Sequence, residues 1–312
     1  MSQAAVLREK YGPWALVTGA SSGIGEQFAR QLARAGFNLL LVARREDRLR
    51  DLRADLGDRR RRETEPLPAD LADPEAPDRI VAALAGRDVG LLVSNAGFGL
   101  KGPFESHSRV RLEAMLNVNA RTPLVLVHAL LPHFRTRAGA GVILTGSVEG
   151  EAPFPWSSAY AATKAFVHSL GMGLYGELTG TGIDVLVLAP GATDTEALGL
   201  QGFDAATLPS VMDPAEVARQ ALRELGRTPL HIPGADNRKF ITQLRRMPRR
   251  RQIEFNATNM AAVLAATGRP VKNRRLRCVQ SRRDEVSAAL LVGEPRRAVI
   301  LRHVYFRRPL VR

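Results

Sequence analysis

The sequence predicts an α/β fold, in which a doubly wound parallel sheet of about seven strands carries helices on both faces. Two observations indicate it. Residues 14–234 alternate short apolar runs with longer amphipathic segments, which is typical of a parallel sheet with crossover helices. The first apolar run also leads directly into a glycine-rich turn and a helix. The length of this part suits a single α/β domain.

Seven short apolar runs form the predicted strands. The run FNLLLVA at 37–43 is apolar apart from one asparagine, as expected for a strand that is buried on both faces. The strands are predicted over residues 14–18, 37–43, 64–69, 89–94, 142–145, 183–188 and 229–232.

Segments with helical periodicity separate these strands. Asp213, followed by a proline, is expected to cap a helix over 214–226. Pro123 and Pro132 are expected to bend or interrupt the long helix predicted over 107–136. The other helices are predicted over residues 24–35, 46–56, 74–85 and 158–179.

Positive charge is concentrated at the C-terminal end. Residues 235–312 hold 20 of the 45 Lys and Arg residues but only 5 of the 31 Asp and Glu residues, so residues 1–234 carry nearly balanced charge. A main domain without a basic face argues against specific nucleic-acid binding. Residues 235–266 are predicted to form a basic amphipathic helical segment. Residues 267–312 are arginine-rich and without a sustained period, so they are expected to be poorly ordered and to contact anionic surfaces nonspecifically.

Composition also excludes several classes of protein. No apolar run approaches the roughly 20 residues that a membrane helix needs, and the first 13 residues do not resemble a secretory signal. The one cysteine, Cys278, cannot form an internal disulfide or a cysteine-rich zinc site. The six histidines lack metal-ligand spacing. We therefore expect a cytoplasmic protein without a metal site.

A glycine-rich turn follows the first predicted strand and indicates a dinucleotide site. Its sequence, TGASSGIG at 18–25, has the spacing GxxxGxG. Backbone N–H groups in such a turn can reach a pyrophosphate, and the helix that follows adds the positive end of its dipole. A turn packed for structural reasons is the alternative. The residues expected to bind the dinucleotide are Gly19, Ser21, Ser22, Gly23, Ile24 and Gly25.

The end of the second predicted strand indicates which dinucleotide. A site selective for NAD places Asp or Glu there to bind the ribose 2′-hydroxyl. This chain has Arg44 and Arg45 instead. Guanidinium groups bind a 2′-phosphate with paired hydrogen bonds, so NADP(H) is the predicted cofactor. The alternative is that both arginines are solvated surface residues.

Three residues suggest acid–base chemistry. Tyr160 and Lys164 lie four positions apart on a predicted helix, so they share one face. A nearby ammonium favours the phenolate and is expected to lower the pKa of Tyr160, which makes the pair useful as acid and base. Ser147 lies thirteen residues upstream, just after the fifth predicted strand. A YxxxK pattern alone arises by chance in many helices, so the interpretation depends on all three.

In this order, the TGxxxGxG turn, Ser147 and the YxxxK pair resemble the short-chain dehydrogenase/reductase superfamily over about residues 10–234. Further segments match family motifs. SNAG at 94–97 resembles the NNAG motif, with Ser94 in place of the first asparagine, and NVN and PGATDT resemble two others. YGPW and VARR resemble the branch of β-ketoacyl and 17β-hydroxysteroid reductases. The resemblance implies a Rossmann-type fold and a homodimer or homotetramer.

The resemblance also implies roles for individual residues. Tyr160 would be the general acid in reduction and the base in oxidation, and Ser147 would stabilise the charge on the substrate oxygen. Lys164 would also bind the nicotinamide ribose, and Asn119 would position a water that relays protons to Lys164. Further cofactor contacts are implied for Asp70, Leu71, Asn95, Ala96, Gly97, Pro190, Gly191, Thr193 and Thr195.

The sequence thus predicts an NADP(H)-dependent oxidoreductase whose substrate is a small-molecule carbonyl compound or secondary alcohol, either of which could be hydrophobic. Phe154, Pro155 and Trp156 form either a hydrophobic substrate wall or ordinary packing. Glu149 and Glu151 are expected to be solvated loop carboxylates. Two other functions remain open, namely a non-catalytic dinucleotide-sensing regulator on the same fold and an anionic-surface-binding protein that acts through its tail.

Overall fold

A parallel seven-stranded sheet lies at the centre of the protein. The computed structural model describes residues 3–57, 62–205, 208, 210–269 and 271. The strand order is β3-β2-β1-β4-β5-β6-β7, and every neighbouring pair is parallel. The strands are β1 (Trp14–Thr18), β2 (Asn38–Ala43), β3 (Thr64–Pro68), β4 (Val89–Ser94), β5 (Ala140–Thr145), β6 (Ile183–Leu188) and β7 (Leu230–His231). The order reverses between β1 and β4, which leaves a crevice at the carboxyl ends of these two strands.

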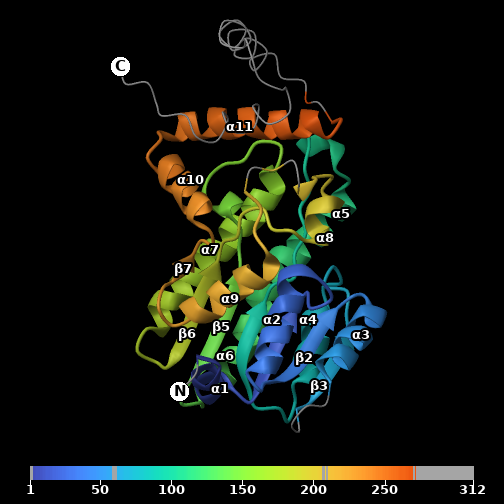
Figure 1. Ribbon diagram of the computed structural model, residues 1–312, viewed down its shortest axis with the longest axis vertical. Helices are drawn as coiled ribbons and strands as arrows, with labels where there is room; N and C mark the ends of the chain where they lie inside the picture. Colours follow the sequence, from blue (N-terminus) through green and yellow to red (C-terminus); the bar gives the residue numbers. More distant parts are fainter. Residues whose placement is uncertain (1–2, 58–61, 206–207, 209, 270, 272–312) are drawn as a thin grey trace, which may run out of the picture.

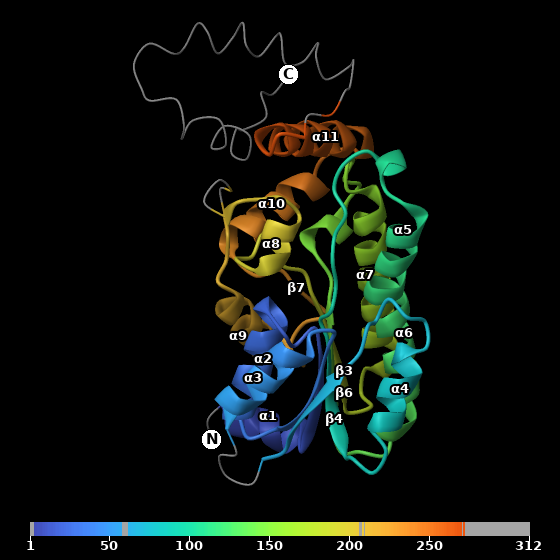
Figure 2. The same ribbon diagram turned by 90° about the vertical axis from the view of Figure 1, so that its right-hand side faces the viewer.

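Helices cover both faces of the sheet (Figure 2). Phe28 is fully buried on one face and Phe134 on the other. One layer comprises α1 (Gln3–Tyr11), α2 (Gly23–Arg34), α3 (Glu46–Leu56) and α9 (Pro214–Glu224). The other comprises α4 (Ala76–Ala83), α6 (Thr122–Phe134) and α7 (Ser158–Leu178). The predicted fold class is therefore confirmed.

The predicted elements match the observed ones within about two residues at each end. The Asp213 side chain caps α9 by accepting a hydrogen bond from the N–H of Ala215 at 2.8 Å. Strand β5 begins at Ala140, two residues earlier than predicted, because Ala140 and Gly141 pair with β6 although their small side chains give no apolar signal.

The long helix predicted over 107–136 is interrupted, as expected, but at one place. It comprises α5 (Arg109–Leu116), a π-helical turn over Asn117–Arg121 and α6. Pro123 has no N–H to donate to the carbonyl of Asn119, and the N–H of Thr122 donates instead to the carbonyl of Asn117. Pro132 lies inside α6 and does not end it. The π turn brings Asn119 to the edge of the crevice.

The composite helix Arg109–Phe134 is long and apolar enough to cross a membrane by length and composition. Half of its apolar window is buried inside the protein, and the core helix of a globular domain passes the same test.

Two helices follow the sheet, where the sequence predicted a helical segment. α10 (Ala235–Arg245) buries Ile241 and Leu244, and α11 (Arg249–Ala266) begins after Pro248 and lies across one end of the molecule (Figure 1). The shorter elements are α8 (Glu196–Leu200) and the 3₁₀ helices Phe104–Ser106 and Val148–Glu151. Of the arginine-rich segment 267–312, which was expected to be poorly ordered, all but residues 267–269 and 271 lie outside the described residues.

Candidate active site

The glycine-rich turn lies between β1 and α2, at the switch point of the sheet. Gly19 has φ +70°, and a Cβ on it would lie 2.8 Å from the Cα of Ala96. A Cβ on Gly25 would lie 2.1 Å from the carbonyl oxygen of Gly19. Only glycine fits these two positions. Ser22 occupies the N-cap position of α2 without a side-chain cap, so the first N–H groups of the helix are open to an anionic ligand.

Thr18 ties this turn to the loop that follows β4. Its Oγ1 accepts hydrogen bonds from the N–H groups of Asn95 and Ala96 at 3.0 and 3.1 Å. The amide of Asn95 in turn donates to the carbonyl of Thr18 and accepts from the hydroxyl of Thr145 on β5, both at 3.4 Å. The carboxyl ends of β1, β4 and β5 are thereby fixed relative to one another.

The other predicted cofactor residues lie along the same edge. Thr195 packs on the turn, since a Cβ on Gly23 would lie 2.7 Å from its Cγ2. Pro190 accepts from the N–H of Val148 at 3.0 Å, next to Ser147. Asp70 is exposed just after β3 and caps its own turn. Gly191 and Thr193 lie between β6 and α8, and the Leu71 side chain packs in the core.

The two arginines predicted to select the cofactor differ in their contacts. Arg45 donates to the Ser21 hydroxyl at 3.2 Å and pairs with Glu196 at 2.7 Å. Arg44 is exposed and makes no side-chain hydrogen bond or ion pair within the part of the chain that the structure describes. Both follow β2, the strand beside β1, so they flank the glycine-rich turn.

The predicted catalytic residues converge. Lys164 is buried on α7, and its Nζ donates to the carbonyl of Thr145 at 2.8 Å and lies 5.7 Å from the ring centroid of Tyr160. The Ser147 hydroxyl lies near enough to the Tyr160 phenol to lower its pKa. A Cβ on Gly97 would lie 3.1 Å from Lys164 Nζ and 3.2 Å from Asn119 Oδ1, which places Asn119 at the same site.

The side chain of Asn119 is fully engaged. It donates to the carbonyl of Phe98 at 2.9 Å and to the Thr163 hydroxyl at 3.0 Å, and it accepts from the N–H of Phe98 at 3.1 Å. A water relay would therefore use its main-chain carbonyl, which Pro123 leaves without the ordinary helical donor.

The expected direction of the Tyr160 pKa shift is wrong. Burial raises the pKa of Tyr160, the Glu149 carboxylate raises it further, and the hydrogen bond with Ser147 only partly offsets both. Burial lowers the pKa of Lys164 to about 8. The Lys164 ammonium lies over the ring of Tyr160 and donates to the carbonyl of Thr145 rather than to the phenol. Its effect on the pKa of Tyr160 therefore does not outweigh burial and Glu149.

The expectation that Glu149 and Glu151 are solvated is also wrong. Glu149 forms an ion pair with Lys101, whose side chain is 1% exposed. Glu151 is 7% exposed and contacts Nδ1 of His168 at 3.0 Å and Nη2 of Arg245 at 2.5 Å. The partners lie far away in the sequence, and no local motif marks them. The polar network around the site therefore extends to helix α10.

His168 connects that network to Ser147. Its Nε2 accepts from the N–H of Ser147 at 3.4 Å, while its Nδ1 faces Glu151. Burial alone would raise the pKa of Glu151, but the hydrogen bonds from His168 and Arg245 outweigh it and hold the pKa below its usual value. A carboxylate on Nδ1 favours the tautomer in which Nε2 can accept.

In the apolar loop before α7, one aromatic side chain packs against α10 and another residue has a strained backbone conformation. Phe154 packs against the cluster that contains Ile241 and Leu244 of α10. Trp156 has φ +65°, a left-handed conformation that costs a bulky residue free energy, and its carbonyl accepts from the N–H of Gly102 at 2.8 Å. The indole Nε1 is buried without a hydrogen-bond partner among the described residues.

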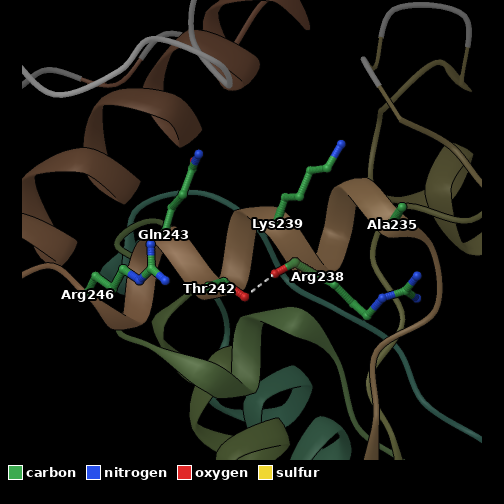
Figure 3. A pocket seen from close by; sticks show the side chains of 6 residues that line it. All are labelled: Ala235, Arg238, Lys239, Thr242, Gln243 and Arg246. Atoms are coloured by element: carbon green, nitrogen blue, oxygen red, sulfur yellow. Dashed lines mark hydrogen bonds between the residues drawn. The ribbon is translucent and has the colours of Figure 1, made fainter.

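A surface hollow of about 430 Å³ lies along α10 (Figure 3). The side chains of Lys239 and Gln243 extend to one side of the helix, and the hydroxyl of Thr242 donates to the carbonyl of Arg238 at 2.7 Å. The hollow is lined by Ala235, Arg238, Lys239, Thr242, Gln243 and Arg246. None of these residues was predicted for the cofactor or substrate site.

Comparison with known proteins identifies the family. The sequence profile of the short chain dehydrogenase family matches residues 13–202, and the chain belongs to this family. It is 31% identical to 7beta-hydroxysteroid dehydrogenase of Clostridium sardiniense over 243 residues, which are 78% of this chain and 93% of that protein. The predicted family resemblance is confirmed, including the branch of hydroxysteroid and ketoacyl reductases.

Solved structures agree with this assignment. One from a study of 7beta-hydroxysteroid dehydrogenase stereoselectivity has a TM-score of 0.74 at 30% identity and covers 80% of this chain and 98% of its own. A short-chain dehydrogenase from Sphingobium yanoikuyae in complex with NADPH has a TM-score of 0.68 at 38% identity, over 72% of this chain and 89% of its own. A dehydrogenase with the same fold thus binds a nicotinamide dinucleotide.

The tight turn at Gly25 yields a test of the dinucleotide site. Gly25→Ala should abolish binding of the dinucleotide. The new Cβ would lie 2.5 Å from the side-chain nitrogen of Asn95 and still closer to the carbonyl of Gly19, so both groups would have to move. Gly173→Ala in α7 is the matched control, since its Cβ meets nothing within 4 Å and should stabilise the helix by about 0.5–1 kcal/mol. NADPH fluorescence titration and thermal unfolding measure both effects. Wild-type binding by the Gly25 variant would contradict the described geometry.

Proposed function

We propose that the protein is an NADP(H)-dependent oxidoreductase that interconverts a carbonyl compound and a secondary alcohol. The observation that carries the proposal is the convergence of Ser147, Tyr160 and Lys164 beside the glycine-rich turn. A regulator that only senses dinucleotides would need the turn but not this trio. The retained acid–base residues therefore favour an enzyme.

The carboxyl edge of the sheet supports an extended dinucleotide. Asp70, Arg44 and the glycine-rich turn follow the neighbouring strands β3, β2 and β1, whereas residues at the ends of β4 and β5 lie against Lys164. The first group suits the adenosine half with its phosphates, and the second suits the nicotinamide half. The free N–H groups at the start of α2 fit the pyrophosphate. When bound, the cofactor would supply or accept the hydride.

Residues of this chain would handle the proton. Tyr160 would donate its phenolic proton to the substrate oxygen as the hydride reaches the carbonyl carbon, and Ser147 would donate a hydrogen bond to the same oxygen. The phenolate formed would be stabilised by Lys164 and reprotonated from solvent through it. A pKa of about 8 allows Lys164 to hold or release a proton near neutral pH. In oxidation of the alcohol the proton would move in the reverse direction.

The substrate that we propose is a bulky, apolar ketone or secondary alcohol. A relative and a structural neighbour carry the name 7beta-hydroxysteroid dehydrogenase, which describes a ring-bearing alcohol substrate. We propose that the loop between Ser147 and Tyr160, which carries Trp156, provides an apolar wall for this substrate. A compact polar ketone would gain little from such a wall.

We also propose a homo-oligomer that uses the outer face of the helical layer formed by α5, α6 and α7 (Figure 2). Large apolar side chains are exposed on these three helices, which is costly unless another surface covers them. A second copy of the chain fits best, because homo-oligomers of closed symmetry are the commonest assemblies. The exposed residues are Val110, Leu116, Leu124, Phe166 and Met172.

The acid–base assignment is tested at the phenol. Tyr160→Phe should reduce turnover of a bulky ketone by roughly 10²-fold or more, because the ring remains but the transferable proton is lost. Folding and NADPH binding should persist. Tyr175→Phe, on the same helix, is the matched control and should keep full activity. Substantial turnover by the Tyr160 variant, measured as NADPH oxidation, would refute the mechanism.

The cofactor assignment is tested at Arg44. Arg44→Ala should weaken NADPH binding by about 1.5–3 kcal/mol, the cost of a lost hydrogen bond to a charged group, and leave NADH binding nearly unchanged. Arg50→Ala removes an exposed arginine that pairs with Glu46 and should change neither affinity. Calorimetric titration with both dinucleotides gives the comparison. Equal affinity of the wild type for NADH and NADPH would contradict the proposed selectivity.

A further inference from the structure

A second buried ammonium group lies at the proposed acid–base site. Lys101 follows β4, its side chain is 1% exposed, and its Nζ lies 4.6 Å from the ring centroid of Tyr160. Lys164 Nζ is farther from the same centroid, at 5.7 Å. The proposed mechanism uses Lys164 and gives Lys101 no role. A buried charge this close to a titrating phenol needs a physical explanation, because its burial costs free energy.

The hydrogen bonds of Lys101 are saturated within the protein. Its Nζ donates to the two carboxylate oxygens of Glu149 at 2.5 and 2.6 Å and to the hydroxyl of Ser157 at 2.7 Å. An ammonium has three donors, so none is left for a substrate. The Ser157 hydroxyl also donates to Glu149. Lys101 is therefore not a substrate-binding cation.

This ion pair is built into the segments that hold the acid–base residues. The N–H of Glu149 donates to the hydroxyl of Ser147 at 3.2 Å, and Ser157 immediately precedes α7, which carries Tyr160. Glu149 itself lies in the 3₁₀ helix that follows Ser147. Movement of either member of the pair would shift both Ser147 and the start of α7.

The two members of the pair act on the phenol in opposite directions. An ammonium within about 4–6 Å favours the phenolate, whereas a carboxylate disfavours it, each by about 1–3 pH units. The charged groups that face Tyr160 are Lys164 from α7, Lys101 from the segment after β4 and Glu149 from the 3₁₀ helix. With Lys101 and Glu149 both charged, their effects on the phenol oppose each other.

We propose that Lys101 and Glu149 form a positioning ion pair that balances the charge beside Tyr160 and so sets the pH range in which Tyr160 transfers its proton. The inference rests on the proposed role of Tyr160. If the pair only fixed the two loops, removal of either charge would lower the rate but would not move the pH profile in a direction that depends on the charge removed.

The test compares the pH profiles of kcat/KM for alcohol oxidation with NADP⁺. Glu149→Gln leaves the Lys101 ammonium uncompensated and should move the profile to lower pH by about 1 unit or more. Lys101→Met leaves the carboxylate uncompensated and should move it to higher pH. The double variant should return close to the wild-type midpoint. Shifts in the same direction, or unmoved midpoints in both single variants, would overturn the proposal.

Two control variants separate charge from folding. Lys101→Arg keeps the charge and should keep the midpoint if the variant folds, as thermal unfolding and NADPH binding will show. Arg87→Met breaks a partly buried ion pair with Glu65, on a different part of the sheet, and should leave the profile unchanged. A shift in the Arg87 variant equal to those at Lys101 or Glu149 would show that loss of any ion pair suffices.

Ultraviolet titration of the phenol provides a readout that needs no turnover. The ionisation of Tyr160 is obtained as the difference between each variant and the same variant that also carries Tyr160→Phe, and it should move in the two opposite directions. If Tyr160→Phe alone is fully active, the proposed function fails. If that variant is inactive but the phenol midpoint does not respond to the pair, the positioning role fails and the function stands.

Discussion

The burial of the Lys164 ammonium is the constraint around which the site is organised. It is 3% exposed and, within the described chain, has the carbonyl of Thr145 as its hydrogen-bond acceptor and no carboxylate partner. A buried ammonium has three donors and is costly when they are unused, so two remain for a ligand. The end of β5, helix α7 and the backbone at Gly97 all meet at this group. The same cost explains why its pKa falls to about 8.

The fold was predictable because its signals are local. A parallel sheet buried on both faces leaves apolar runs, and crossover helices leave amphipathic ones, so β2 and α9 could be placed from their own residues. The signals fail where pairing overrides composition, as at Ala140 in β5. They also fail where the absence of a backbone N–H changes the helix one turn earlier. Pro123 has no N–H to donate to the carbonyl of Asn119, and the helix widens into a π turn there. Neither effect leaves an apolar pattern.

The site was predictable only as far as its motifs reach. The glycine turn, Ser147, Tyr160 and Lys164 lie in short segments whose spacing indicates their chemistry. The charged residues around them leave no such local signal. Lys101 binds Glu149, which is 48 positions away in the sequence, and Arg245 binds Glu151, which is 94 positions away. Sequence spacing suggested that a lysine would lower the pKa of the phenol. Burial and a carboxylate that only the fold brings near reverse that direction.

The proposed function requires this chain to transfer a hydride from a nicotinamide to a carbonyl carbon. The most direct measurement uses NADPH carrying deuterium at the transferable position, a panel of bulky cyclic ketones and mass spectrometry of the alcohols formed. We predict that the product carries one deuterium on its carbinol carbon, in an amount equal to the NADPH consumed. NADPH that binds but keeps its deuterium on the nicotinamide with every ketone would contradict it.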